Sequence, residues 1–279
     1  MSTPESEYGP LPAGVVRILA PNPSVMTGPG TNTFLVADEA AGAVVVIDPG
    51  PDIPDHLRRI ADEVGRRGAA RAILVTHGHP DHAEGAAALR DLLGVPVYAW
   101  SREGVPAMDT ALADDEIVLV GARRLRALYT PGHRFDHLCF LLEDSEALFA
   151  GDLIAGEGTV VIAPPEGDLL DYMASLRRLR ALAPRLILPA HGPLLDQPQA
   201  VLDYYITHRD EREQQVLAAL ANGPQPIMNL VRVVYAEVNP DLHPLAAQSL
   251  LAHLQKLERE GRVHRMTDDV GSEQWSLGA

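Results

Sequence analysis

The residues best suited to chemistry stand in one short stretch, His77-Gly78-His79-Pro80-Asp81-His82. Three imidazoles and one carboxylate within six residues supply the nitrogen and oxygen donors that Zn²⁺ binds. His77 and His79 can point the same way if the chain is extended there, whereas Asp81 and His82 follow a turn that Pro80 helps to set. A single histidine in a loop would usually be a solvated surface residue. So dense a mixture of donors instead favours a metal site.

Other metal-capable side chains occur where predicted strands end. The apolar, β-branched run 71–76 predicts a buried strand that stops at His77. Three later apolar runs are each followed closely by one more donor, namely His133, Asp152 and His191. Because functional residues gather on loops at strand ends, we expect these donors to meet the first stretch in space.

The chain around these donors alternates predicted strands and helices. Strands are predicted at 15–19, 34–37, 43–47, 71–76, 95–99, 116–120, 125–130, 137–142, 147–150 and 186–189, and helices at 55–68, 83–93 and 168–182. Asp168 is a suitable N-cap for the last of these helices. Runs of strands combined with crossover helices predict an α/β (α+β) fold with two mixed sheets sandwiched between helices.

The pattern changes from about Tyr204. Helices predicted at 209–221, 227–238 and 245–260 are followed by short strands at 262–265 and 273–277, which is the order of a winged helix. We therefore expect a catalytic domain at 1–204 and a small winged-helix-like domain at 205–279. The smaller domain has seven basic and ten acidic side chains, so packing or homodimer formation is favoured over DNA reading.

Composition limits the partners and the compartment. A net charge of −15 disfavours sequence-independent phosphate binding, and an aromatic content of 5% offers few rings for base stacking. Cys139, the single cysteine, excludes an intramolecular disulfide and is expected to be buried. Residues 1–7 lack the basic and apolar regions of an export signal, and no apolar run reaches about 18 residues. A cytoplasmic protein without membrane contact is expected.

Together these motifs resemble those of the metallo-β-lactamase superfamily. The HxHxDH motif of that family stands here as His77, His79, Asp81 and His82, and its later motifs stand as His133, Asp152 and His191. The resemblance implies an αββα sandwich that holds two Zn²⁺ per chain, with Fe or Mn as other candidate metals. It implies His77, His79 and His133 on a first metal, Asp81, His82 and His191 on a second, and Asp152 bridging both.

Further positions narrow the resemblance. Asp48 matches an early structural aspartate of the superfamily, which implies that it orients the ligand loop. The segments 28–33, 133–137, 164–168, 249–254 and 261–263 resemble the lactamase-beta-like group with a C-terminal winged-helix tail, which includes an endoribonuclease. Related thioesterases carry the same catalytic half. True β-lactamases of the commonest class use cysteine where Asp152 stands, which argues against antibiotic hydrolysis.

The resemblance also implies a mechanism. Two ions about 3.5 Å apart would lower the pKa of a shared water towards 7, and Asp81 could orient that water and take its proton. His137 is a further catalytic candidate that would polarise the substrate; otherwise it is a hydrogen-bonded histidine at the start of a strand.

We expect a binuclear zinc hydrolase of a small acyl compound, either a thioester, an ester or a lactone. A single-stranded RNA endoribonuclease is the alternative, which the acidic charge opposes. A mononuclear iron thiol dioxygenase that uses His77, His79 and His133 comes next. A non-enzymatic DNA-binding regulator that uses the C-terminal tail, with the metal site as a sensor, is a further alternative.

Overall fold

The computed structural model of the protein describes residues 10–267 and 271–278. The prediction for residues 1–7 lies outside the described residues. The chain forms two units. The first comprises the chain up to Thr130 together with residues 136–160 and 182–199, and the second comprises residues 131–135, 161–181 and 200 onward.

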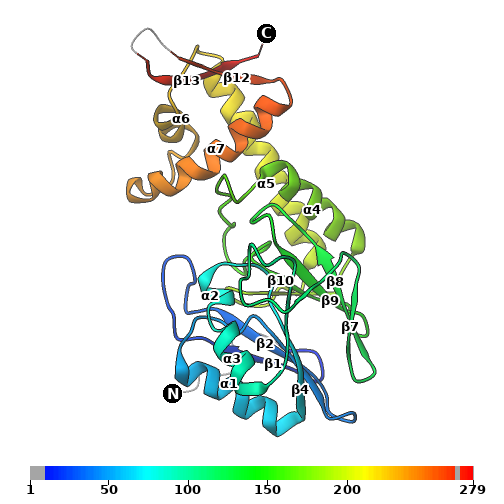
Figure 1. Ribbon diagram of the computed structural model, residues 1–279. Coiled ribbons are helices and arrows are strands. Elements are labelled where there is room, and N and C mark those ends of the chain that lie inside the picture. Colours follow the sequence, from blue (N-terminus) through cyan, green and yellow to red (C-terminus); the bar gives the residue numbers. More distant parts are fainter. Residues whose placement is uncertain (1–9, 268–270, 279) are drawn as a thin grey trace. The chain divides into compact units, whose positions relative to one another are not determined.

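The first unit contains a six-stranded sheet. Its strands lie in chain order, β1 (Val15–Leu19), β2 (Asn32–Asp38), β3 (Ala43–Ile47), β4 (Ala69–Leu74), β5 (Val97–Ala99) and β6 (Thr110–Ala111). The pairs from β1 to β3 are antiparallel and those from β3 to β6 are parallel. Helices α1 (Pro54–Arg67) and α3 (Ala86–Leu93) lie side by side against one face of this sheet (Figure 1). Leu57, Ile60 and Val64 of α1 are buried there.

A five-stranded sheet completes the first unit. Its order is β11 (Leu186–Pro189), β10 (Ala147–Gly151), β9 (Leu138–Leu142), β8 (Arg123–Tyr129) and β7 (Ile117–Val120). All neighbours are antiparallel except β10 and β11, which are parallel. Every residue of β9 and β10 is buried, which is why both read as continuous apolar runs in the sequence.

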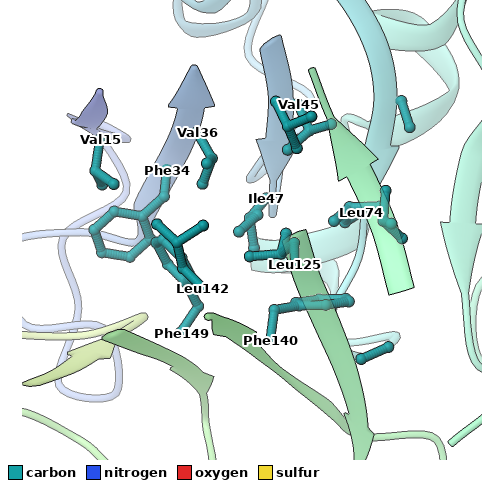
Figure 2. Packing of buried hydrophobic residues seen from close by; sticks show 14 of the residues in the cluster. Val15, Phe34, Val36, Val45, Ile47, Leu74, Leu125, Phe140, Leu142 and Phe149 are labelled. Carbon is teal, nitrogen blue, oxygen red and sulfur yellow. The ribbon is translucent and has the colours of Figure 1, made fainter. Parts of the chain in front are cut away.

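The two sheets pack face to face around one apolar core. Phe34 of β2 and Phe149 of β10 meet edge to face, with ring centroids 5.2 Å apart. Figure 2 shows these rings between the strands of the two sheets. Aliphatic side chains from both sheets fill the remaining space, among them Val36, Val45, Ile47, Leu74, Leu125 and Leu142. The predicted pair of mixed sheets is therefore confirmed, and Cys139 is buried as expected.

The second unit contains the C-terminal helices. These are α4 (Leu169–Leu182), α5 (Pro198–Leu220), α6 (Ile227–Val234) and α7 (His243–Arg259), and the short strands β12 (Val263–Thr267) and β13 (Glu273–Leu277) form a hairpin. Asp168 caps α4, since its Oδ1 accepts hydrogen bonds from the backbone N–H groups of Leu170 (2.8 Å) and Asp171 (3.1 Å). Trp275 of β13 is fully buried among residues of α6 and α7, which closes the winged helix.

Several boundaries differ from the prediction. The helix predicted at 83–93 is divided into α2 (Pro80–Ala83) and α3, with Gly85 between them. A Cβ at Gly85 would lie 2.8 Å from Leu57 Cδ2 and 3.0 Å from the carbonyl oxygen of Gly50, so this position is tightly packed. Helix α5 begins at Pro198 and not at Arg209, because proline suits a first helical turn. The predicted boundary between 204 and 205 lies inside α5 and stays a prediction.

None of the helices in the described ranges combines the length and the apolar character needed to span a bilayer.

Candidate metal centre

The chemically active side chains of the first unit follow its central strands. Asp48 comes directly after β3, His77 lies three residues after β4, Asp152 follows β10, and His191 lies two residues after β11. The pairs β3–β4 and β10–β11 are parallel, so each pair delivers its two residues to the same sheet edge. This is the arrangement that the strand-end pattern predicted.

Asp48 holds the start of the ligand loop. Its backbone has a φ of +52°, a left-handed conformation that aspartate adopts more readily than most residues. Oδ1 accepts a hydrogen bond from the backbone N–H of Thr76 (2.7 Å), while Oδ2 accepts from Thr76 Oγ1 (2.8 Å) and lies 2.8 Å from His82 Nδ1. The carboxylate is 2% exposed. One buried side chain therefore fixes both ends of the loop that carries the histidines.

These bonds also fix which nitrogens carry protons. Thr76 donates its hydroxyl hydrogen to Asp48, so in its 3.0 Å contact with His77 Nδ1 the nitrogen must donate. His82 Nδ1 likewise donates to the Asp48 carboxylate. When each ring carries a single proton, that proton lies on Nδ1 and Nε2 has the lone pair needed to bind a metal.

Of the residues that the structure describes in the first unit, two groups have donor sets that could hold a metal ion: His77, His79 and Asp152 in one, and Asp81, His82 and His191 in the other. The donor atoms of His77, His79 and Asp152 lie within 4.8 Å of one another, and so do those of the second group. In the second unit, His133 Nδ1 lies 3.0 Å from the carbonyl oxygen of Val161 and donates to it, which leaves its Nε2 unprotonated.

Asp152 presents a different oxygen to each group. Its Oδ1 lies 3.2 Å from His191 Nε2 and 3.4 Å from His82 Nε2, whereas its Oδ2 lies 3.9 Å from His77 Nε2. Asp81 Oδ2 faces His82 Nε2 and His191 Nε2 at 3.3 Å each. The Asp152 carboxylate thus lies between His77 and the second group, as a bridging ligand would.

The donor chemistry of the second group fits a cation. His82 Nε2 is buried and makes no hydrogen bond, although carboxylate oxygens of Asp81 and Asp152 lie nearby. A buried lone pair beside two carboxylates is costly unless a positive charge offsets it. Imidazole nitrogen and carboxylate oxygen together are ordinary ligands of Zn²⁺. These residues therefore suit a divalent ion.

Without an ion, protons would offset the carboxylate charge. Burial lowers the pKa of His82, but Asp152, Asp81 and Asp48 outweigh it and raise that pKa well above its ordinary value. Burial also lowers the pKa of His191, yet Asp152 and Asp81 bring it up to about 9. The imidazoles in turn hold the pKa values of both Asp81 and Asp152 below their usual range, although burial opposes this. All four groups are therefore charged at neutral pH in the metal-free protein.

Metal affinity is expected to rise with pH. His191 and His82 must each lose a proton to bind an ion, so the Zn²⁺ affinity of this group should increase by at least about tenfold per pH unit until pH reaches about 9. The raised pKa also stabilises the metal-free fold below pH about 6.5, and this contribution is lost as pH rises through about 9. Calorimetric titration in two buffers of different ionisation enthalpy measures the released protons. A Zn²⁺ affinity that stays constant across this range would contradict the expectation.

Asp48→Asn is expected to weaken Zn²⁺ binding about 10- to 100-fold. Asparagine tolerates the positive φ, but its NH₂ group would face His82 Nδ1 and force the ring to carry its proton on Nε2. The measurement is the Zn²⁺ dissociation constant of metal-free protein. Asp38→Asn is the matched control, because Asp38 accepts hydrogen bonds from the backbone N–H groups of Ala41 and Ala122, away from the metal groups. Equal affinity in both variants would rule out the role of Asp48.

Asp136 supports the same loop from another direction. Its Oδ2 accepts a hydrogen bond from the backbone N–H of Gly78, between His77 and His79, at 2.9 Å. The side chain is 1% exposed, and a Cβ at Gly104 would lie 1.7 Å from this oxygen. The HxH turn is therefore held by a buried carboxylate that fits only against a glycine.

His137 is enclosed by the fold. Its Nδ1 lies 3.0 Å from Thr130 Oγ1, and its Nε2 accepts a hydrogen bond from the backbone N–H of Asp152 at 3.1 Å. The residue is fully buried, and a Cβ at Gly151 would lie 2.6 Å from Nε2. The predicted contact of His137 with a substrate stays a prediction. These contacts favour a role in holding the backbone of Asp152.

The sequence pattern did not single out Thr31, Thr76 or Asp136. Each is a buried polar residue that bonds to the ligand-bearing segments, and each lies in or next to a segment that the motifs did mark. A buried threonine at the end of an apolar strand, as at Thr76, is the one signal that could have pointed to such a role.

Comparisons with known proteins agree with this arrangement. A family model described as the metallo-beta-lactamase superfamily matches residues 26–191, more than half of the chain. A model described as the beta-lactamase associated winged helix domain matches residues 227–275. The beta-lactamase-like protein 2 homolog of Drosophila melanogaster is 35% identical over 283 residues, covering 93% of this chain and 93% of that protein.

Solved structures show the same fold. A beta-lactamase domain protein from Burkholderia ambifaria has a TM-score of 0.83 at 23% identity, covering 99% of this chain and 95% of that one. The protein TTHA1623, solved in a di-iron-bound form, has a TM-score of 0.51 at 28% identity, covering 63% of this chain and 94% of that one. The chain belongs to the metallo-β-lactamase superfamily and is a metal-dependent hydrolase of that family, with a C-terminal winged-helix domain.

Proposed function

We propose that the protein is a binuclear zinc hydrolase of a small acyl compound, a thioester, an ester or a lactone. The observation that carries the two-ion proposal is Asp152, whose Oδ1 faces His82 and His191 while its Oδ2 faces His77. The di-iron form of the relative TTHA1623 supports two ions in such a site. Imidazole nitrogen together with carboxylate oxygen as donors favours zinc.

Two bound ions would supply a hydroxide nucleophile near neutral pH and draw charge from the substrate oxygen. The chain's own residues do the rest. The Asp81 carboxylate faces the second donor group, so it can orient the attacking water and accept its proton. The water oxygen bonds to the acyl carbon, the bond to the thiol or alcohol breaks, and the proton passes from Asp81 to the leaving group.

Charge supports a small substrate over RNA. The net charge is −15, and arginines of the first unit such as Arg67, Arg123 and Arg124 each pair with a carboxylate at 2.7 to 2.8 Å. A groove that follows a phosphate backbone normally needs basic side chains that are free to contact it.

The winged-helix unit supports the same choice. In α7, where a DNA reader would place its contacts, Ala246, Ser249, His253 and Lys256 are all buried. Lys256 Nζ lies 2.6 Å from Glu213 Oε1 and 2.7 Å from Glu260 Oε1. These contacts are those of a packing helix. We therefore propose a packing or homodimer role for this unit, for which exposed Met228 and Val233 of α6 provide apolar surface.

The proposal is tested by assaying acyl thioesters, lactones and a labelled RNA oligomer side by side, with and without chelator. We expect chelator-sensitive turnover of an acyl substrate and no RNA cleavage. RNA cleavage without acyl turnover would reverse the order of the two candidates.

Elemental analysis of freshly purified protein tests the metal. About two equivalents of zinc per chain are expected. One equivalent of iron, together with O₂ uptake in the presence of a persulfide, would instead identify a thiol dioxygenase.

A further inference from the structure

The loop between β1 and β2 bonds directly to the second donor group. Thr31 stands at its end, is fully buried, and donates a hydrogen bond from Oγ1 to Asp81 Oδ2 at 3.0 Å. This is the same carboxylate oxygen that faces His82 Nε2 and His191 Nε2 at 3.3 Å each. A carboxylate oxygen has two lone pairs, so it can accept from Thr31 and still face an ion.

The direction of this hydrogen bond is set by Asn22. The Asn22 Oδ1 accepts from the backbone N–H of Thr31 at 2.9 Å, and an N–H can only donate. The other amide atom of Asn22 is therefore the NH₂ group, which donates to Thr31 Oγ1 at 2.9 Å. With one lone pair so occupied, the Thr31 hydroxyl has its hydrogen free for Asp81. Asn22 thus orients Thr31, and Thr31 orients the carboxylate.

The neighbouring residue holds the other ligand of the group. Asn32 Nδ2 donates to the carbonyl oxygens of Pro189 (3.0 Å) and Gly192 (3.1 Å), on either side of His191. The Asn32 backbone N–H donates to Ala190 at 2.7 Å. Thr31 and Asn32 together therefore connect Asp81 to the turn that carries His191.

We propose that Thr31, oriented by Asn22, is a positioning residue that controls occupancy of the metal group formed by Asp81, His82 and His191. The proposal rests on the metal-binding function proposed above. The β1–β2 loop then sets the affinity of one of the two metal groups for its ion. Loss of the Thr31 hydroxyl frees the Asp81 carboxylate to rotate and weakens the ion in its group, while the ion held by His77, His79 and Asp152 keeps its ligands.

The test titrates Zn²⁺ into the metal-free full chain and follows heat. Thr31→Val is expected to weaken one binding step about 10- to 100-fold and to leave any other step unchanged. Thr31→Ser restores the hydroxyl and should restore the affinity. The matched control is Thr33→Val, which removes an equally buried hydroxyl on β2 that contacts His56 Nε2 at 3.1 Å and no donor of either group.

A second variant tests the proposal independently, in case Thr31→Val does not fold. Asn22→Asp keeps the acceptor for the Thr31 N–H but replaces the NH₂ donor with an oxygen, so the Thr31 hydroxyl turns towards residue 22. Its added negative charge would by itself strengthen cation binding. Weaker binding of one ion in this variant therefore supports the proposal that Asn22 orients Thr31 and Thr31 orients Asp81. Unchanged or stronger binding overturns it.

The outcomes separate this inference from the proposed function. Two ions in the wild type with both affinities unchanged in Thr31→Val would overturn the inference and leave the binuclear proposal intact. A single ion that weakens in Thr31→Val would support the inference and remove the binuclear claim, whereas a single unaffected ion would overturn both. Equal weakening in Thr33→Val would also overturn the inference, because the effect would then come from any lost buried hydroxyl.

Discussion

Asp81→Ala is expected to lower kcat/KM for the acyl substrate by about 10² to 10⁴-fold or more, with the fold intact. The side chain loses its role as proton acceptor and also leaves His82 and His191 without the oxygen that faces them both. Its side chain is 26% exposed, so little packing is lost. The measurements are steady-state kinetics and thermal unfolding.

The control for this change is Asp55→Ala, which removes an exposed carboxylate from α1, where it pairs with Arg58. It should leave both kinetics and Tm nearly unchanged. Full activity in Asp81→Ala would contradict the proposed mechanism. Among the described residues, only Asp81 and Asp152 place a carboxylate oxygen near both His82 and His191.

Asp152→Asn is expected to bind at most one ion per chain and to lose at least about 10³-fold in turnover, because it removes the charge shared by both groups. Asparagine keeps the volume of the side chain, so the packing around β10 is retained. Metal content by elemental analysis and turnover are the direct measurements. Two tightly bound ions in this variant would exclude a bridging role.

The same variant has a second readout that needs no metal. Asp152 is the largest of the influences that raise the pKa of His191 against the effect of burial. In metal-free Asp152→Asn, the pKa of His191 should therefore fall below its wild-type value of about 9. Titration of the imidazole resonances by NMR measures this shift. An unchanged pKa would mean that Asp81 alone holds the proton on the ring.

The metal-capable residues that follow apolar strands could be predicted from the sequence. Asp152 and His191 each follow a fully apolar strand, and strands of that kind are recognised by composition. The parallel pairing of β10 with β11 then brings both residues to one edge. The local apolar pattern and the sheet topology agree here, so the placement of these two residues at one edge could be predicted from the sequence.

The supporting contacts could not be predicted because they join distant segments. Thr31 and Asp81 are 50 residues apart, and Gly78 and Asp136 are 58 apart. Such pairs depend on the register of loops, and neither apolar periodicity nor turn chemistry encodes that register. The tight packing at Gly85 is also a contact between distant segments, since a Cβ there would lie 2.8 Å from Leu57 Cδ2 of another helix. Helix α5 was predicted to begin too late because Tyr204 and its neighbours match no simple amphipathic pattern.

The burial of Lys256 has a consequence for chemical modification. It is the single lysine of the sequence, and its ammonium group is enclosed between Glu213 and Glu260. Acetylation and ubiquitination of lysine side chains need an accessible ammonium group, and this one is 8% exposed. Amine-directed cross-linkers and dyes will therefore react poorly with the side chains of the folded protein. Rapid labelling of Lys256 would instead report opening of the contact between α5 and α7.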